Sequence, residues 1–115
     1  MRLLKPTLPE VDLNQVFQNV DTWKEEYEYG FVTVFDEGIA QYLICDPVSH
    51  YLFYAALILD KKSLRCKVTK EEPPDVLDDK GNVLEFIGSV SEQKTGSVEK
   101  LFKIMSARGY KIKRI

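Results

Sequence analysis

The chain lacks long hydrophobic runs, because its longest uninterrupted apolar stretch, residues 51–59, has nine members. A membrane-spanning helix needs about 20 apolar residues, so we expect no transmembrane segment. At the N-terminus only Leu3 and Leu4 precede Pro6, which is too short an apolar core for a signal peptide. We therefore expect a cytoplasmic protein that does not bind membranes.

Cysteine and histidine are scarce, with two cysteines and one histidine in the chain. Cys45 and Cys66 fall on predicted strands with another strand between them, which places them roughly 10 Å apart. A disulfide tolerates a Cα separation of only about 7 Å, so we expect two buried free thiols. His50 flanks a predicted turn and is expected to face solvent. A Cys45–His50 contact across that turn is conceivable as a catalytic pair, but the solvated interpretation is preferred.

Motifs for cofactors and metals are also missing. Neither G-x-G-x-x-G nor G-x-x-x-x-G-K-S/T occurs, and no C-x-x-C or H-E-x-x-H pattern is present. The acidic segment 75–82 does not fit a calcium loop, because Val76 would occupy the first ligand position. Two carboxylate clusters, 25–28 and 78–79, are expected to be solvated surface. The sequence thus predicts no catalytic residue, no cofactor and no metal site.

The composition that is present belongs to an ordinary globular protein, with 44% hydrophobic and 30% charged residues among 115. This length is typical of one domain, so we expect a single domain over residues 1–115. Pro6 and Pro9 indicate that residues 1–10 form an extended lead-in.

Charge is distributed unevenly along the chain. Residues 1–57 hold three basic and nine acidic side chains, whereas residues 58–115 hold 13 basic and nine acidic ones. Residues 10–37 alone contain eight acids and one base, Lys24. This asymmetry is the one compositional indication of a partner.

Helical periodicity marks both ends of the chain. Between residues 12 and 27 the apolar side chains recur on one helical face after Asp12, a suitable N-cap, with a break conceivable near residues 19–21. Near the C-terminus Ser97 is suited to cap a helix that ends at Gly109. Its expected apolar stripe consists of Val98, Leu101, Phe102 and Met105.

Between the helices, turn residues divide the apolar runs into a predicted antiparallel meander followed by a hairpin. The four meander strands are expected at residues 27–36, 39–46, 50–60 and 63–69. The hairpin is expected at residues 76–87, with Gly81 in its turn, and a last edge strand at 110–115. The predicted fold is α+β: an antiparallel sheet of five to six strands, with an N-terminal and a C-terminal helix packed on it.

Residues 51–59 decide this interpretation, because they carry no polar side chain on either face. Such a run is typical of a central strand covered on both sides, although a buried helix has the same pattern. The flanking turns and the aromatic residues favour the strand. Two helices can cover only one face of the sheet, so the second face calls for a partner or a pocket.

Tyrosines are concentrated on three of the predicted strands, and tyrosine is enriched in interface hot spots. Packing of these tyrosines in the core, with their hydroxyls at its rim, is an equally open alternative. The candidate interaction residues are Tyr27, Tyr29, Tyr42, Tyr51, Tyr54, Glu25, Glu26 and Glu28.

Three functions follow from these observations. We expect a non-catalytic protein-binding module, such as an inhibitor, an immunity-type protein or a chaperone-like adaptor, with a protein partner or a second copy as its ligand. The first alternative is a small-ligand binder or modest enzyme with a pocket between sheet and helices, using Tyr54 or His50. The second is nucleic-acid binding through the basic C-terminus, where Tyr110 would stack on a base, but a pI near 5.4 disfavours it.

Overall fold

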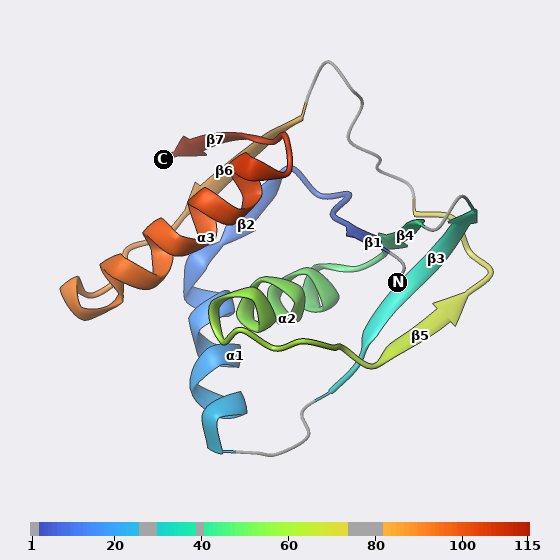
Figure 1. Ribbon diagram of the computed structural model, residues 1–115, viewed down its shortest axis with the longest axis horizontal. Helices are drawn as coiled ribbons and strands as arrows, with labels where there is room; N and C mark the ends of the chain where they lie inside the picture. Colours follow the sequence, from blue (N-terminus) through green and yellow to red (C-terminus); the bar gives the residue numbers. More distant parts are fainter. Residues whose placement is uncertain (1–2, 26–29, 39–40, 74–81) are drawn as a thin grey trace.

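The computed structural model describes residues 3–25, 30–38, 41–73 and 82–115, shown in Figure 1. Its helices are α1 (Leu13–Glu25), α2 (Pro47–Ile58) and α3 (Thr95–Ala107), with a short 3₁₀ turn, η1 (Glu92–Lys94), before the last. Its strands are β1 (Leu3–Lys5), β2 (Glu10–Asp12), β3 (Val32–Gly38), β4 (Gln41–Ile44), β5 (Cys66–Thr69), β6 (Val83–Ile87) and β7 (Lys111–Arg114).

These strands form two sheets rather than one. The first sheet has the order β1-β4-β3-β5 and the second has the order β2-β6-β7. The fold is therefore α+β as predicted, but the predicted antiparallel sheet of five to six strands is wrong. Only β3 and β4 pair antiparallel, and the other four strand pairs are parallel. Parallel neighbours need long crossovers, and the segments containing α2 and α3 supply them for β3–β5 and β6–β7.

The expected strand at residues 50–60 is helix α2, so the four-stranded meander does not form. Its start is defined by Asp46, an extended N-cap whose Oδ1 accepts the Ser49 N–H at 2.7 Å, and by Pro47 at the first helical position. Proline suits that position because the N–H it lacks would have no partner inside the helix. The turn expected between residues 46 and 50 is thus the start of a helix.

Helix α2 lies between α1, α3 and the first sheet (Figure 1), and it contacts β2 and β3 as well as both helices. Because neighbours surround it, the helix is apolar all round instead of on one stripe. Its buried residues are Ser49, His50, Leu52, Phe53, Tyr54, Ala55, Ala56 and Ile58. The apolar residues of this segment pack against other parts of the same chain, so their burial does not require a partner protein.

The predicted N-terminal helix is confirmed as α1, which runs without a break through residues 19–21. Asp12 precedes its first residue, and the Asp12 Oδ1 accepts the Asn14 N–H at 2.9 Å, as expected of an N-cap. Val16, Val20 and Trp23 are buried on its inner face. The lead-in before it is extended, but its two ends pair in different sheets, β1 with β4 and β2 with β6.

The C-terminal helix is confirmed as α3, with Val98, Leu101 and Met105 buried. The predicted cap at Ser97 is wrong, because the helix already begins at Thr95 and Ser97 lies in its first turn. Gly109 follows with φ +100°, the left-handed conformation that ends a helix and that glycine adopts without strain. The final strand lies at a sheet edge, as predicted, but β7 pairs parallel with β6. Part of the predicted hairpin, 74–81, lies outside the described residues; its second strand, β6, pairs with β2 and β7.

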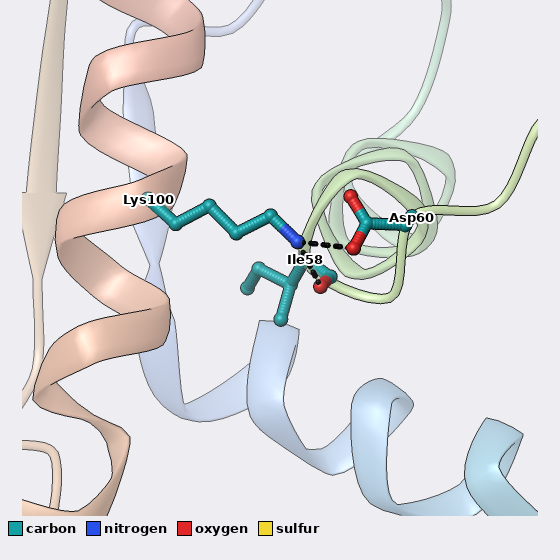
Figure 2. A network of polar contacts seen from close by, with 3 residues as sticks. All are labelled: Ile58, Asp60 and Lys100. Carbon is teal, nitrogen blue, oxygen red and sulfur yellow. Dashed lines mark hydrogen bonds and ion pairs between the residues drawn. The ribbon is translucent and has the colours of Figure 1, made fainter.

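A single lysine joins α3 to the end of α2 (Figure 2). Lys100 Nζ donates to the Ile58 carbonyl at 3.1 Å and to the Asp60 Oδ2 at 2.6 Å. The Ile58 carbonyl belongs to the last turn of α2, where helix carbonyls lack partners and a cation is favourable. Asp60 adopts φ +56°, which aspartate tolerates in a chain reversal.

Candidate functional site

The structure separates the tyrosines that the sequence grouped on one sheet. Tyr42 lies on β4, whereas Tyr51 and Tyr54 lie on α2. Tyr42 and Tyr51 are half-buried, and Tyr54 is fully buried. Glu25 is the last residue of α1, and Tyr27, Tyr29, Glu26 and Glu28 lie outside the described residues. Whether any of these residues contacts a partner stays a prediction.

His50 is buried rather than exposed, with 2% of its surface accessible. Its Nε2 accepts the Thr7 N–H at 2.9 Å and the Leu8 N–H at 3.3 Å. Its Nδ1 donates to the Asp46 carbonyl at 2.7 Å. Amides only donate and carbonyls only accept, so the geometry requires a neutral ring with the proton on Nδ1.

Both ring nitrogens of His50 are therefore committed to the backbone. Burial lowers the pKa of His50, and the contact of the ring with Asp46 opposes this only in part. Thr7 adds a further link, because its hydroxyl donates to the Ile44 carbonyl at 2.6 Å. The histidine holds the lead-in against α2 and is not placed as a catalytic base.

The two cysteines are free, and β3 lies between the strands that carry or adjoin them. Cys45 follows β4 and is half-buried, whereas Cys66 begins β5 and is exposed, so the expectation of two buried thiols is wrong for Cys66. Partial desolvation of the sulfur atoms raises the pKa of both thiols, and the negative charge of Asp46 adds to the effect at Cys45. A raised pKa keeps a thiol protonated at neutral pH, which weakens it as a nucleophile.

An open groove of about 620 Å³ lies beside the C-terminal half of α2. Its apolar surface comes from both sheet strands and helix, and its rim comes from the segment after α2 and the residue after α3. The lining residues are Leu4, Tyr42, Phe53, Ala56, Leu57, Lys61, Lys62, Ser63, Leu64, Cys66 and Arg108.

The charges around this groove have one sign. Lys61, Lys62 and Arg108 line it, and no acidic side chain is among the lining residues that the structure describes. Lys61 Nζ lies 5.3 Å from the centre of the Trp23 ring, and Arg108 Cζ lies 5.8 Å from the centre of the Phe53 ring. These ring contacts hold two of the cations at the groove, and no carboxylate among the described lining residues offsets their positive charge.

Arg108 also lies close to two buried phenols. Burial raises the pKa of Tyr54 and of Tyr110, and the positive charge of Arg108 partly opposes both shifts. The Tyr54 hydroxyl is buried without a hydrogen-bond partner among the residues that the structure describes. Both phenols stay neutral at physiological pH, so neither of them neutralises the positive charge of Arg108.

A second hollow of about 430 Å³ lies between the start of α1 and the segment after β6. Its lining includes Lys94 and Asp21, whose side chains approach each other to 3.5 Å. Lys94 Nζ also lies 5.0 Å from the centre of the Phe17 ring. Since the two opposite charges offset each other, this hollow has a weaker electrostatic preference than the groove beside α2.

Other site chemistries find less support in the structure. Within residues 3–25, 30–38, 41–73 and 82–115, no cluster of three His, Cys, Asp or Glu side chains is arranged to hold a metal. Tyr110, which the sequence offered for stacking on a base, is only 9% exposed. Among the same residues no helix is long and apolar enough to cross a membrane.

The fold and groove thus define a mixed α+β protein with a cationic, apolar-floored groove. Comparisons with protein-family models, with curated proteins and with solved structures give no match to this chain. Its function therefore has to be argued from the groove itself.

The sequence contained one signal for this groove that went unused. Residues 61–70 carry five cations, Lys61, Lys62, Arg65, Lys67 and Lys70, and no acid. From the sequence alone, this run is assigned only to a strand and its flanking turns. Arg108, 38 positions after the end of this run, joins the groove only through the packing of α3 on α2.

Proposed function

We propose that this chain is a non-catalytic binding module whose groove beside α2 receives an apolar side chain of a partner protein flanked by carboxylates. The observation that carries the proposal is the combination of an apolar floor with three cations and no acid among the described lining residues. Carboxylates on the partner would complement this charge, and the apolar side chain would lose its contact with water.

Binding is favoured over catalysis by the state of the reactive groups. Both nitrogens of His50 are hydrogen-bonded to the backbone. Cys66, the thiol in the groove, has a raised pKa. A nucleophile needs an adjacent base or a lowered pKa, and neither is present beside Cys66 among the described groove residues.

A small amphipathic anion, such as a fatty acid, is the second candidate ligand. The groove volume of about 620 Å³ falls within the range of small-molecule sites. A protein partner is preferred because the groove is open and because Val68, which is 55% exposed, lies on the same side of the sheet as the lining residue Cys66. Exposed apolar surface next to a polar rim is typical of protein interfaces.

Selection of a phage-displayed library of random 12-residue peptides on the full chain tests the proposal. We expect enrichment of acidic peptides that contain a large apolar residue. Synthetic versions of these peptides should bind in fluorescence anisotropy titrations, and the affinity should fall as salt increases because exposed charges are screened. Enrichment of basic peptides, or of none, would contradict the proposal.

Two tryptophan variants locate the binding. Ser63 is exposed in the groove and Ser89 is exposed in the second hollow. Ser63→Trp should fill the groove and weaken a selected peptide at least tenfold, whereas Ser89→Trp should leave the affinity within about twofold. Equal effects of the two variants would place the peptide elsewhere. Displacement of the peptide by dodecanoate would show that the small anion occupies the same groove.

A matched pair of charge reversals separates the cationic rim from net charge. Lys62 lines the groove, and Lys103 is exposed on α3 outside it. Lys62→Glu and Lys103→Glu change the net charge equally. Only Lys62→Glu should weaken the peptide strongly, because Coulomb interactions between exposed groups decay within about a Debye length of roughly 10 Å.

A further inference from the structure

Strand β5 begins at Cys66, which lines the groove, and one of its two edges has no neighbouring strand among the described residues. It is the last strand of its sheet and pairs with β3 alone among the described strands. In Figure 1 it lies at the margin of the molecule, on the far side of β3 from β4. An edge strand presents backbone donors and acceptors to which another extended chain can pair.

The register identifies which backbone groups face outward. The Arg65 carbonyl accepts the Val32 N–H at 2.8 Å, so Arg65 directs its backbone groups toward β3. Successive residues of a strand alternate in this respect. Lys67 and Thr69 therefore also face β3, and the N–H and C=O groups of Cys66 and Val68 face away from it.

The side chains of β5 alternate between the two faces of the sheet at this edge. Cys66 and Val68 pair with Val32 and Val34 in the parallel register, so they lie on the buried, α2-facing side of the sheet. Cys66 already lines the groove, and Val68 is 55% exposed. A strand added at this edge would direct every second side chain toward the groove.

The other face of the edge is positively charged. Lys67 points to that face, where its Nζ lies 5.8 Å from the centre of the Phe31 ring. Residues 61–70, which include β5 and the cationic rim of the groove, carry five cations and no acid. Such a charge pattern complements an acidic chain and repels a basic one.

We infer that a partner protein binds by adding an acidic, extended segment as a strand to the free edge of β5, with one of its apolar side chains inserted in the groove. This inference rests on the proposed function and specifies its mode. Strand addition draws affinity from main-chain hydrogen bonds and specificity from pockets for alternate side chains. The outward groups of Cys66 and Val68 and the groove beside them supply both.

The strand β7 provides an internal control for charge. It is also an edge strand and also basic, with Lys111, Lys113 and Arg114. Lys113 lies 3.9 Å from a carboxylate oxygen of Glu85, and β7 does not contribute to the groove lining. A peptide that bound only through positive charge on an edge strand would protect the amides of β7 as well as those of β5.

Amide hydrogen exchange of the ¹⁵N-labelled full chain tests the inference. The probe is an eight-residue peptide, blocked at both ends, with glutamate at every second position and valine between, except for one central phenylalanine. We expect the Cys66 and Val68 amides to exchange at least tenfold more slowly with peptide bound. Lys67 and Thr69, already paired with β3, should change little, and the β7 amides should not gain protection. Protection without this alternation, or equal protection of β7, would overturn the inference.

Substitutions at one position provide a second measurement. Val68→Pro removes the outward N–H, while Val68→Ala removes a similar part of the side chain and keeps the N–H. Proline is tolerated where an edge N–H faces solvent. We expect Val68→Pro to bind the probe about three- to tenfold more weakly than Val68→Ala, the usual effect of one hydrogen bond. Equal affinities of the two variants would contradict strand addition.

The two proposals fail in different ways. If Ser63→Trp weakens the probe while Cys66 and Val68 gain no alternating protection, the groove binds a partner but the strand-addition mode is wrong. If Ser63→Trp has no effect on any selected peptide, the proposed function itself is wrong.

Discussion

Helix α2 and the segment that follows it, residues 61–70, are neighbours in the chain and opposites in environment. α2 buries eight of its 12 residues. Residues 61–70 contain five cations, and none of them is buried. The protein thus places its most apolar segment at the centre and a strongly basic segment immediately beside it.

This contrast explains the position of the groove in the fold. α2 forms the centre of the core, because α1, α3 and the first sheet pack around it. The segment 61–70 then passes along the edge of that core without being covered by it. The groove lies at this border, which explains why its floor is apolar and its rim is cationic.

The largest expected difference between the two regions is in the effect of side-chain truncation. Leu52 on α2 is 4% exposed, whereas Val68 on β5 is 55% exposed. Leu52→Ala should lower the free energy of unfolding by about 3 kcal/mol through lost burial and a cavity. Val68→Ala should change it by less than about 0.5 kcal/mol. Urea denaturation measures both, and similar losses would show that β5 is covered in solution.

The next effect concerns the start of α2. His50→Gln disrupts three backbone hydrogen bonds of the imidazole, so we expect a loss of about 2 kcal/mol in the free energy of unfolding at neutral to alkaline pH. Urea titrations of wild type and variant measure this loss.

The same histidine predicts a pH dependence. Burial lowers the pKa of His50 from its ordinary value of 6.5, so the unfolded chain binds the proton more readily than the folded one. The stabilisation is complete above pH 6.5 and is lost as the pH falls through the folded pKa. The stability difference between wild type and His50→Gln should therefore narrow as the pH falls below 6.5. A difference that is constant with pH would contradict the neutral, buried imidazole.

A smaller effect of opposite sign is expected in the middle of α2. The Tyr54 hydroxyl is buried without a partner among the described residues. Tyr54→Phe removes this unsatisfied group and keeps the ring packed against Phe53 and Phe86. The free energy of unfolding should rise by about 1 kcal/mol, measured by chemical denaturation. A loss of stability would show that the hydroxyl has a partner in solution.

The smallest effect lies at the junction of the two regions, where Lys100 binds the end of α2 (Figure 2). Lys100→Met removes the bonds to the Ile58 carbonyl and to Asp60. The Asp60 side chain is 77% exposed, so solvent screens the ion pair, and we expect a loss of about 0.5 kcal/mol. High salt should reduce the difference from wild type. A loss that is independent of salt would assign the effect to the carbonyl contact alone.

Local signals in the sequence located most of the helix and strand positions. The 3.6-residue periodicity and the Asp12 cap predicted α1, and Gly109 predicted the end of α3. The segment β6–α3–β7 also carried a strand–helix–strand pattern that favours parallel pairing. The prediction of an antiparallel sheet was wrong because it assumed short turns between the strands and assigned the residues of α2 to a strand.

The candidate site was less accessible from the sequence. Residues 61–70 were visible as a basic run, but Leu4, Tyr42 and Arg108 come from distant parts of the chain. Nothing local indicates that these three side chains meet at one groove. His50 was misjudged for a related reason, since its hydrogen-bond donors, Thr7 and Leu8, lie more than 40 positions earlier.

The sequence by itself determined the amphipathic helices, the Asp12 cap, the helix end at Gly109 and the basic run, because these depend on neighbouring residues and their periodicity. Only the tertiary structure decided that residues 51–59 are helical and that the strands form two sheets. A segment that is apolar on every side is compatible both with a strand covered on its two faces and with a helix surrounded by other elements. Which of them forms depends on the neighbours that the rest of the chain provides, and here α1, α3 and the first sheet surround a helix.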